Sequence, residues 1–388
     1  MYSAKRRKLI LIVFAFVIVP FLGFTVRLQE HLSLAPEEIQ HSEKLNFKLD
    51  TIKTDIKVPW GMVFLPNGDM LVSDLNGQIS VLRGGKVTQT VEGAPEIFRK
   101  AQGGLFDLQL HPNYAKNGWL YISYSAKSDN SEEEGGNTAI IRCKLKDNKL
   151  VEKQLIFQAR PYTTKGIHFG ARMEFDKNGF LYFSVGERGE MDRAQRLDTY
   201  NGKIYRLHDD GTVPKDNPFL NTEGAVKATY SYGHRNPQGL ALNPWTGEIW
   251  DTEHGPMGGD ELNIIRKGKN YGWPAITYGI DYDSTIISKD TVKVGMEQPV
   301  KFWRPSIAPS NLLFVNSDKY PSWKGNILVC AMKFQYLERC EIEGEKVTHI
   351  EKLVQNIGRV RNIAQSPDGY IYLAIDGGMI VKIVPLPK

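Results

Sequence analysis

The chain has 388 residues, of which 41% are hydrophobic and 24% are charged, and its 36 glycines and 20 prolines lie between apolar segments. This composition excludes a disordered or collagen-like chain. The formal net charge is +5, but the cluster KRRK at residues 5–8 supplies most of it. A nucleic-acid-binding protein is therefore not expected, because contacts to phosphates need a dense basic surface.

Residues 9–26 follow this basic cluster and form an uncharged apolar segment, LILIVFAFVIVPFLGFTV. Its length is close to the lower limit for a helix that crosses the hydrocarbon core of a membrane. Positive residues before such a segment tend to stay in the cytoplasm, so we expect the rest of the chain to lie on the other side of the membrane. A helix buried in the protein core is the alternative.

The segment is not followed by an A-x-A-like cleavage site, so residues 1–30 are expected to be an uncleaved membrane anchor rather than a removed signal peptide. The protein would then be periplasmic or otherwise extracytoplasmic, and anchored to the cytoplasmic membrane by residues 9–26. Residues 31–50 are polar and of mixed charge, which predicts a stalk or linker before a single folded domain at residues 51–388.

Cysteine usage leaves the redox state open. Cys143, Cys330 and Cys340 are an odd number in a compartment that permits disulfides. Cys330 and Cys340 could pair across a hairpin, and free thiols are the alternative.

A short pattern recurs six times from residue 58 onward: an alternating apolar stretch, a turn that ends in Gly, and a second strand rich in Tyr, Val, Leu and Ile. Such spacing suits blades of about four strands with insertions. We therefore predict one all-β, six-bladed β-propeller, with a β-sandwich as the alternative. The turn glycines are Gly68, Gly118, Gly179, Gly247, Gly325 and Gly369.

The connections between the copies also indicate where function is concentrated. No amphipathic helix of 12 or more residues is expected in them, and the longest intervals fall around residues 180–320. In a propeller, the loops at one mouth of the central channel surround the site, so we expect the functional residues in this region.

Polar residues stand directly beside the predicted blade strands. His168 and Arg172 lie at a strand start in GIHFGARMEF, where a lone His is more often structural. Arg235 and Asn236 precede a rigid Pro in GHRNPQG. A guanidinium next to an amide suits anion recognition, although Arg235 could also pair with an acid between blades. Motifs for nucleotide binding, serine hydrolases and classical zinc proteases are absent from the sequence.

Two later segments suggest a metal ion and an anion. The segment EHGPMGGDE frees backbone carbonyls at Gly255 and Pro256 near carboxylates, which suits a hard cation such as calcium, with an ordinary turn as the alternative. Lys333 follows a strand, and Arg359 and Arg361 lie at i, i+2 on another, so both arginines face the same way. Together with Arg235 they predict a positive mouth for a small polyanionic ligand, whereas each alone is compatible with a solvated surface cation.

These segments carry a resemblance to a known family. The stretches AQGGLFDLQLHPNYAKNGWLYISYS, NGKIYRLHDDGTVPKDNPF, YGHRNPQGLALNP, EHGPMGGDELNIIRKGKNYGWP and VRNIAQSPDG resemble the soluble aldose sugar dehydrogenases that depend on pyrroloquinoline quinone (PQQ), over about residues 50–385. The resemblance implies a six-bladed propeller with PQQ over one mouth of the channel, and an enzyme that oxidises aldose sugars.

The resemblance also implies roles for individual residues. His168 stands at the position of the catalytic base, and Arg235 and Asn236 stand beside the reactive quinone carbonyl. The calcium ligands match the carbonyls of Gly255 and Pro256. The remaining matches bind the cofactor or line its site: Gln102, Lys333, Arg359 and Arg361.

Two departures concern the sugar site. His254 replaces a glutamine, and Ile167 replaces an acid before the catalytic His, which leaves the preferred sugar open.

The implied reaction removes a proton and a hydride from the anomeric carbon of an aldose and yields a lactone. Calcium would act as a Lewis acid on the quinone, and the electrons would pass to a respiratory quinone or cytochrome. Two other functions remain open. One is a calcium-dependent lactonase on a six-bladed propeller, against which the late cations argue. The other is a non-catalytic binding propeller, which leaves His168 and Arg235 unexplained.

Overall fold

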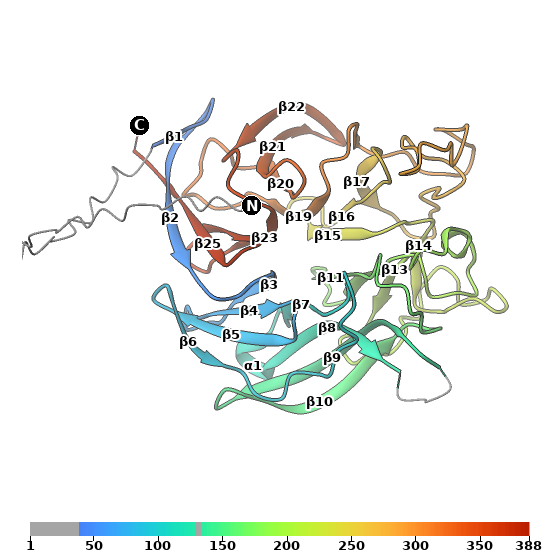
Figure 1. Ribbon diagram of the computed structural model, residues 1–388, viewed down its shortest axis with the longest axis horizontal. Helices are drawn as coiled ribbons and strands as arrows, with labels where there is room; N and C mark the ends of the chain where they lie inside the picture. The colour runs from blue at the N-terminus through green and yellow to red at the C-terminus, as the bar shows by residue number, and fades with distance from the viewer. Residues whose placement is uncertain (1–38, 129–132, 388) are drawn as a thin grey trace, which may run out of the picture. The chain divides into compact units, whose positions relative to one another are not determined.

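The computed structural model describes residues 39–128 and 133–387, and the predicted all-β, six-bladed β-propeller is confirmed in these residues (Figure 1). The strands of each blade are given from the innermost outward. The first blade contains β3 (Pro59–Phe64), β4 (Met70–Asp74), β5 (Gln78–Arg83) and β6 (Lys86–Thr90), and the second contains β7 (Leu105–Leu110), β8 (Trp119–Lys127), β9 (Gly136–Lys146) and β10 (Lys149–Gln158). The third contains β11 (Gly170–Phe175), β12 (Leu181–Val185), β13 (Lys203–Leu207) and β14 (Thr229–Tyr232).

The next two blades have the same antiparallel four-stranded order, and the sixth has five strands. The fourth blade contains β15 (Pro237–Leu242), β16 (Ile249–Glu253), β17 (Asp260–Ile265) and β18 (Lys301–Trp303), and the fifth contains β19 (Pro309–Phe314), β20 (Ile327–Ala331), β21 (Tyr336–Glu343) and β22 (Lys346–Leu353). The sixth contains β23 (Val360–Gln365), β24 (Ile371–Ile375), β25 (Met379–Pro385), β2 (Asn46–Lys53) and β1 (Gln40–His41).

The sixth blade joins the two ends of the described chain and corrects the expected linker. Strand β2 pairs with β25 from Phe47 opposite Pro385 to Lys53 opposite Met379, which closes the ring of blades. Residues 40–50 were expected to lie in a linker, but they belong to this sheet because β25 offers an unpaired edge to them. The membrane anchor expected at residues 9–26 lies outside the described residues.

The six predicted turn glycines all stand between the first and second strands of a blade. Their φ values run from 70° at Gly118 to 88° at Gly325, which is the left-handed region that glycine adopts without strain. The recurring Gly therefore marks one hairpin per blade, as the sequence predicted.

Helical structure is short in the described residues. It consists of α1 (Tyr114–Asn117) and the 3₁₀ turn η1 (Met191–Gln195). Across residues 39–128 and 133–387, no helix has the length and apolar character needed to span a membrane.

The core lies between neighbouring blades. Leu328 and Cys330 of the fifth blade pack with Val381 of the sixth, whereas Ile327 and Cys340 of the fifth pack with Trp250 of the fourth. Cys330 and Cys340 thus lie on opposite faces of one sheet and are free thiols, and the suggestion that they pair is wrong. Burial of each such aliphatic side chain contributes about 1.5–3 kcal/mol to folding.

Candidate active site

The predicted site residues converge at the mouth where the innermost strands begin. Four residues predicted for the cofactor site, together with His254, line one pocket of about 200 Å³: Gln102, Asn236, Arg359 and Arg361. Its remaining lining is mostly apolar or aromatic, including Trp60, Phe106, Phe169 and Met332. A partly apolar pocket with a few convergent polar groups is the usual form of a small-molecule site.

His168 lies at the edge of this pocket, two residues before β11. Its backbone N–H donates to Oε1 of Gln102 at 2.8 Å, and its Nδ1 is hydrogen-bonded to the carboxylate of Glu187, which follows β12. The side chains of His168 and Glu187 are 13% and 1% exposed. Burial lowers the pKa of His168 below its ordinary value of 6.5, and the bond to Glu187 opposes this shift. The imidazole is therefore neutral near pH 7, with Nε2 left for a ligand.

The backbone at His168 is held in an unusual conformation by Arg188. His168 has a φ of 53°, which is unfavourable for a residue with a side chain. The guanidinium of Arg188 lies 3.5 Å from the ring of Phe169, donates to Lys165 O at 2.6 Å, and also bonds the carbonyl of Ile167. Burial lowers the pKa of this guanidinium to about 9.

Glu187 and Arg188 were missed in the sequence. They stand in VGERG, directly after the second strand of the third copy, and this position at a strand end is the signal that could have found them. Neighbouring strands of a blade are antiparallel, so the end of β12 meets the start of β11, where His168 lies.

Arg235 and Asn236 lie directly before β15, as predicted, and both are buried. Arg235 Nη1 donates to Gly255 O at 2.9 Å, and its backbone N–H donates to Oε2 of Glu253 at 2.8 Å. Its Nε is buried and has no acceptor among the described residues. Asn236 Oδ1 accepts from Gly170 N at 3.0 Å, which fixes the start of β11.

The loop from Gly255 to Gly259 is built around Asp260. One oxygen of Asp260 accepts from Gly255 N at 2.8 Å, and the other accepts from Ser306 Oγ and Ile307 N at 2.7 Å each. A Cβ at Gly255 would lie 2.4 Å from Gly258 O, so only glycine fits there. Asp260 was expected as one of the carboxylates near a metal, but its hydrogen bonds make it an anchor of the loop.

A cluster of buried carboxylates lies behind this loop. Burial, followed by repulsion from Glu253, raises the pKa values of Asp251 and Glu261 well above their ordinary range. Both oxygens of Asp251 lack a hydrogen-bond partner in the described part of the chain. Ligand atoms of His234, Asp251 and Glu253 lie within 4.8 Å of one another, so these residues could hold a cation.

The three late cations lie near the same mouth but differ in their surroundings. Both Arg361 and Arg359 bond the carboxylate of Asp376, at 2.7 and 3.2 Å, so the two arginines face the same way, as their spacing predicted. The sequence analysis did not anticipate Asp376. Lys333 is exposed over the ring of Phe334, next to Met332 of the pocket.

His254 lines the same pocket as Arg359 and Arg361. Its Nε2 is 2.8 Å from Pro309 O and therefore carries the proton as a donor. Burial, together with the positive charge of Arg235, lowers the pKa of His254 to about 3. The imidazole that replaces the glutamine expected here is thus a neutral part of the pocket wall.

Comparisons with known proteins identify the family. The family model for glucose/sorbosone dehydrogenases matches residues 56–382. The chain is 38% identical over 346 residues to the aldose sugar dehydrogenase YliI of Escherichia coli (strain K12). This match covers 87% of this chain and 92% of the relative. It is 27% identical over 420 residues to quinoprotein glucose dehydrogenase B of Acinetobacter calcoaceticus, with 87% of each chain covered.

Solved structures give the same result. The soluble aldose sugar dehydrogenase of Escherichia coli in its apo-form superposes with a TM-score of 0.83 at 36% identity, over 88% of this chain and 100% of that one. The PQQ-bound aldose sugar dehydrogenase of Streptomyces coelicolor superposes with a TM-score of 0.71 at 26% identity, over 87% and 99%. The match to the family model, the identity to these relatives and the shared six-bladed fold show that this chain belongs to the glucose/sorbosone dehydrogenase family of sugar oxidoreductases.

Proposed function

We propose that this protein is a PQQ- and calcium-dependent dehydrogenase that oxidises aldose sugars at the anomeric carbon to lactones. The observation that carries the proposal is the neutral, oriented imidazole of His168 beside a pocket lined by arginines. The electrons would pass to a respiratory quinone or cytochrome. We also propose that residues 9–26 anchor the protein to the cytoplasmic membrane, with the propeller on the periplasmic or extracytoplasmic side.

The mouth has the charge that a polyanionic cofactor needs. PQQ carries three carboxylates, and the mouth offers Arg235, Lys333, Arg359 and Arg361, of which Arg359 and Arg361 share the carboxylate of Asp376. The buried Nε of Arg235 is a donor without an acceptor among the described residues, and such a donor is costly unless a ligand or water meets it. These residues fit PQQ, with Gln102 and Asn236 on the pocket wall.

The donor set beside the pocket also fits calcium. Gly255, Glu253 and Glu261 line a cavity of about 10 Å³, and oxygen donors with nearby carboxylates suit this ion. Arg235 donates to the carbonyl of Gly255, so a calcium ion held by Gly255 and Pro256 would need the buried carboxylates to balance the charge.

When bound, PQQ supplies a quinone that accepts a hydride, and Ca²⁺ supplies a Lewis acid. The chain itself supplies the base. Because Nδ1 of His168 bonds Glu187, Nε2 has the lone pair that can take the proton of the sugar hydroxyl. Glu187 then faces the imidazolium and stabilises its charge. Arg235 supplies a fixed positive charge where negative charge develops.

The two alternative functions have less support. A lactonase of this fold does not need the cations Lys333, Arg359 and Arg361 at the mouth, and two carboxylates there are already engaged: Glu187 bonds His168 and Asp376 bonds two arginines. A non-catalytic binding propeller gives no reason for a buried Glu to orient an imidazole at a strained backbone position.

The test is reconstitution. The purified protein is incubated with PQQ and Ca²⁺, and reduction of an electron-accepting dye is measured with a panel of aldoses. Activity that requires both PQQ and an aldose supports the proposal. Hydrolysis of lactones without PQQ, or no gain in thermal stability from PQQ in the presence of Ca²⁺, would contradict it and favour the lactonase or the binding propeller.

A further inference from the structure

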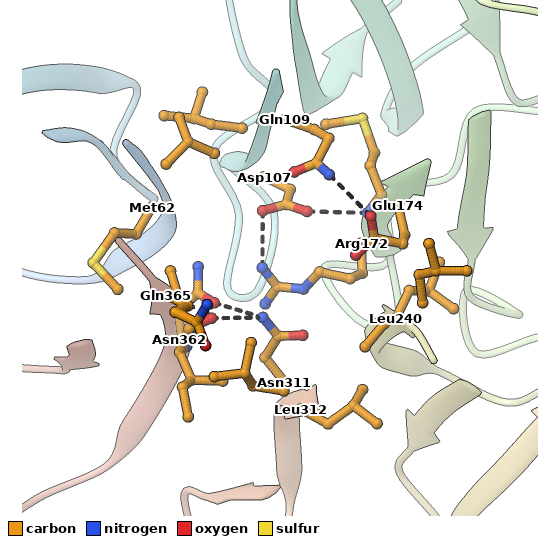
Figure 2. A pocket seen from close by; sticks show the side chains of 18 of the residues that line it. Met62, Asp107, Gln109, Arg172, Glu174, Leu240, Asn311, Leu312, Asn362 and Gln365 are labelled. Carbon is orange, nitrogen blue, oxygen red and sulfur yellow. Dashed lines mark hydrogen bonds and ion pairs between the residues drawn. The ribbon is translucent and has the colours of Figure 1, made fainter. Parts of the chain in front are cut away.

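A second cavity occupies the central channel beyond the candidate active site (Figure 2). It has a volume of about 420 Å³, and the second half of every innermost strand contributes to its wall. The candidate active site lies instead at the starts of these strands, so the two spaces are at different ends of the channel. The volume is in the range of about 300–1,000 Å³ that is usual for small-molecule sites.

A buried ion pair separates the two spaces. Arg172 Nη1 lies 2.9 Å from Oδ1 of Asp107, and both side chains are almost wholly buried. Arg172 Nε donates to Gln238 O at 2.9 Å, and its guanidinium lies 4.1 Å from the ring of Trp60. Gln238 and Trp60 line the active-site pocket, so Arg172 forms a floor between that pocket and the second cavity.

Three polar side chains on the wall of the second cavity each have one atom without a hydrogen-bond partner among the described residues. Asn311 donates through Nδ2 to Asn362 Oδ1 at 2.6 Å, and Gln365 donates through Nε2 to Asn316 Oδ1 at 2.8 Å. These bonds fix both amides and leave their carbonyl oxygens as buried acceptors with no donor among the described residues. Arg172 Nη2 is likewise a buried donor without an acceptor in that part of the chain. Arg172 and Asn311 are 2% and 8% exposed.

The charges of the cavity favour a neutral ligand. Arg172 is neutralised by Asp107, so an anion would meet the carboxylate and a cation would meet the guanidinium. Glu174, on the same wall, is partly buried and accepts from Gln109 Nε2 at 3.1 Å. Burial raises the pKa of Glu174 to about 8, which keeps it uncharged at neutral pH.

The groups that need partners suit hydroxyls. A hydroxyl donates one hydrogen bond and accepts others, so one kind of group can meet the acceptors of Asn311 and Gln365 and the donor of Arg172. Leu240, Leu312 and Met62 lie around these polar groups, as Figure 2 shows, and supply apolar wall that can contact the C–H faces of a ring.

We propose that this cavity is a binding site for a small, neutral, polyhydroxylated molecule of sugar or cyclic polyol size, separate from the candidate active site. The site is formed by Asn311, Gln365 and Arg172. The proposal does not rest on the proposed dehydrogenase activity.

The test uses two probes that have no free anomeric hydroxyl: myo-inositol and methyl α-D-glucopyranoside. Each is titrated calorimetrically into the purified protein without added PQQ. We expect saturable binding of at least one probe, with one site per chain and a Kd below about 10 mM. Heats equal to those of dilution for both probes would overturn the proposal and leave water as the content of the channel.

Matched variants test whether the probes bind in the second cavity or in the candidate active site. Asn311→Leu and Gln365→Leu each remove one acceptor and should weaken binding by about tenfold, the usual effect of one lost hydrogen bond. Gln102→Leu, at the other mouth, should leave the Kd unchanged. Gln365 is less buried than Asn311, so Gln365→Leu decides the matter if Asn311→Leu fails to fold. Loss of binding in Gln102→Leu with retention in Gln365→Leu would place the probes in the active site and refute the proposal.

Discussion

Nδ1 of His168 is hydrogen-bonded to the carboxylate of Glu187; His168 lies just before β11 and Glu187 just after β12, two adjacent strands of the third blade. The bond fixes which imidazole nitrogen carries the proton. It also brings a negative charge to a group whose pKa burial would otherwise lower further. Two predictions rest on this pair.

Glu187→Gln should reduce kcat roughly 10–100-fold, because the imidazole loses the charge that stabilises its protonated form. His168 must be neutral to act as a base, so activity is lost as the pH falls through its pKa, which lies below 6.5. Without the carboxylate that pKa falls, and the acid limb of the kcat/KM profile moves to lower pH. The control is Glu190→Gln, which alters an exposed ion pair with Lys165. An unchanged profile in Glu187→Gln would show that Glu187 does not act through His168.

His168→Gln should lower kcat by roughly 10²–10⁴-fold, the usual contribution of a positioned acid–base group. The binding of PQQ should be retained, because the cations that would hold its carboxylates are untouched. Stopped-flow measurement of sugar oxidation, with PQQ affinity from thermal shifts, separates the two effects. Near-normal turnover in this variant would mean that His168 is not the base.

Lys333→Ala and Arg361→Ala should each weaken PQQ binding by roughly 10–150-fold, because each removes a charge-assisted contact worth about 1.5–3 kcal/mol. Raising the PQQ concentration should restore activity in both variants, whereas it should not rescue His168→Gln. Lys319→Ala, which removes a lysine that lies over the ring of Tyr370, serves as the control. A chelator should have the same effect as the two cation variants, and added Ca²⁺ should reverse it. Unaltered PQQ affinity in both variants would remove these cations from the cofactor site.

Glu174→Gln should change the pH dependence of stability. Burial, with repulsion from Asp107, raises the pKa of Glu174 in the folded protein to about 8 from an ordinary 4.5, and Arg172 opposes this. Between these values the folded state keeps a proton that the unfolded state has lost, so wild-type stability falls as the pH rises through this range.

Glutamine has no proton to lose, so the free energy of unfolding of the variant should rise relative to wild type across the same range, by up to a few kcal/mol. Urea unfolding at about pH 5 and about pH 8.5 measures this difference. Glu223→Gln, at an exposed carboxylate, should show little difference. A constant difference for Glu174→Gln at the two pH values would contradict the raised pKa.

Much of the architecture follows from local sequence. The glycine in the first hairpin of each blade, the alternation of apolar residues and the scarcity of helical periodicity are all set by neighbouring residues, so they predict the six blades. The positions of His168, Arg235 and Arg361 at strand starts were also visible, because a side chain at the start of an innermost strand has to lie near one mouth of the ring.

The tertiary structure decided what depends on contacts between distant segments. Strand β2 could be assigned to the last blade only once β25 presented its edge to residues 46–53, and Cys330 and Cys340 were separated by the two faces of one sheet. The partners of the site residues were likewise not visible in the sequence. Glu187 reaches His168 and Asp376 reaches Arg361 only because antiparallel pairing within a blade returns the chain to the same mouth, and sequence spacing alone does not fix which acid meets which base.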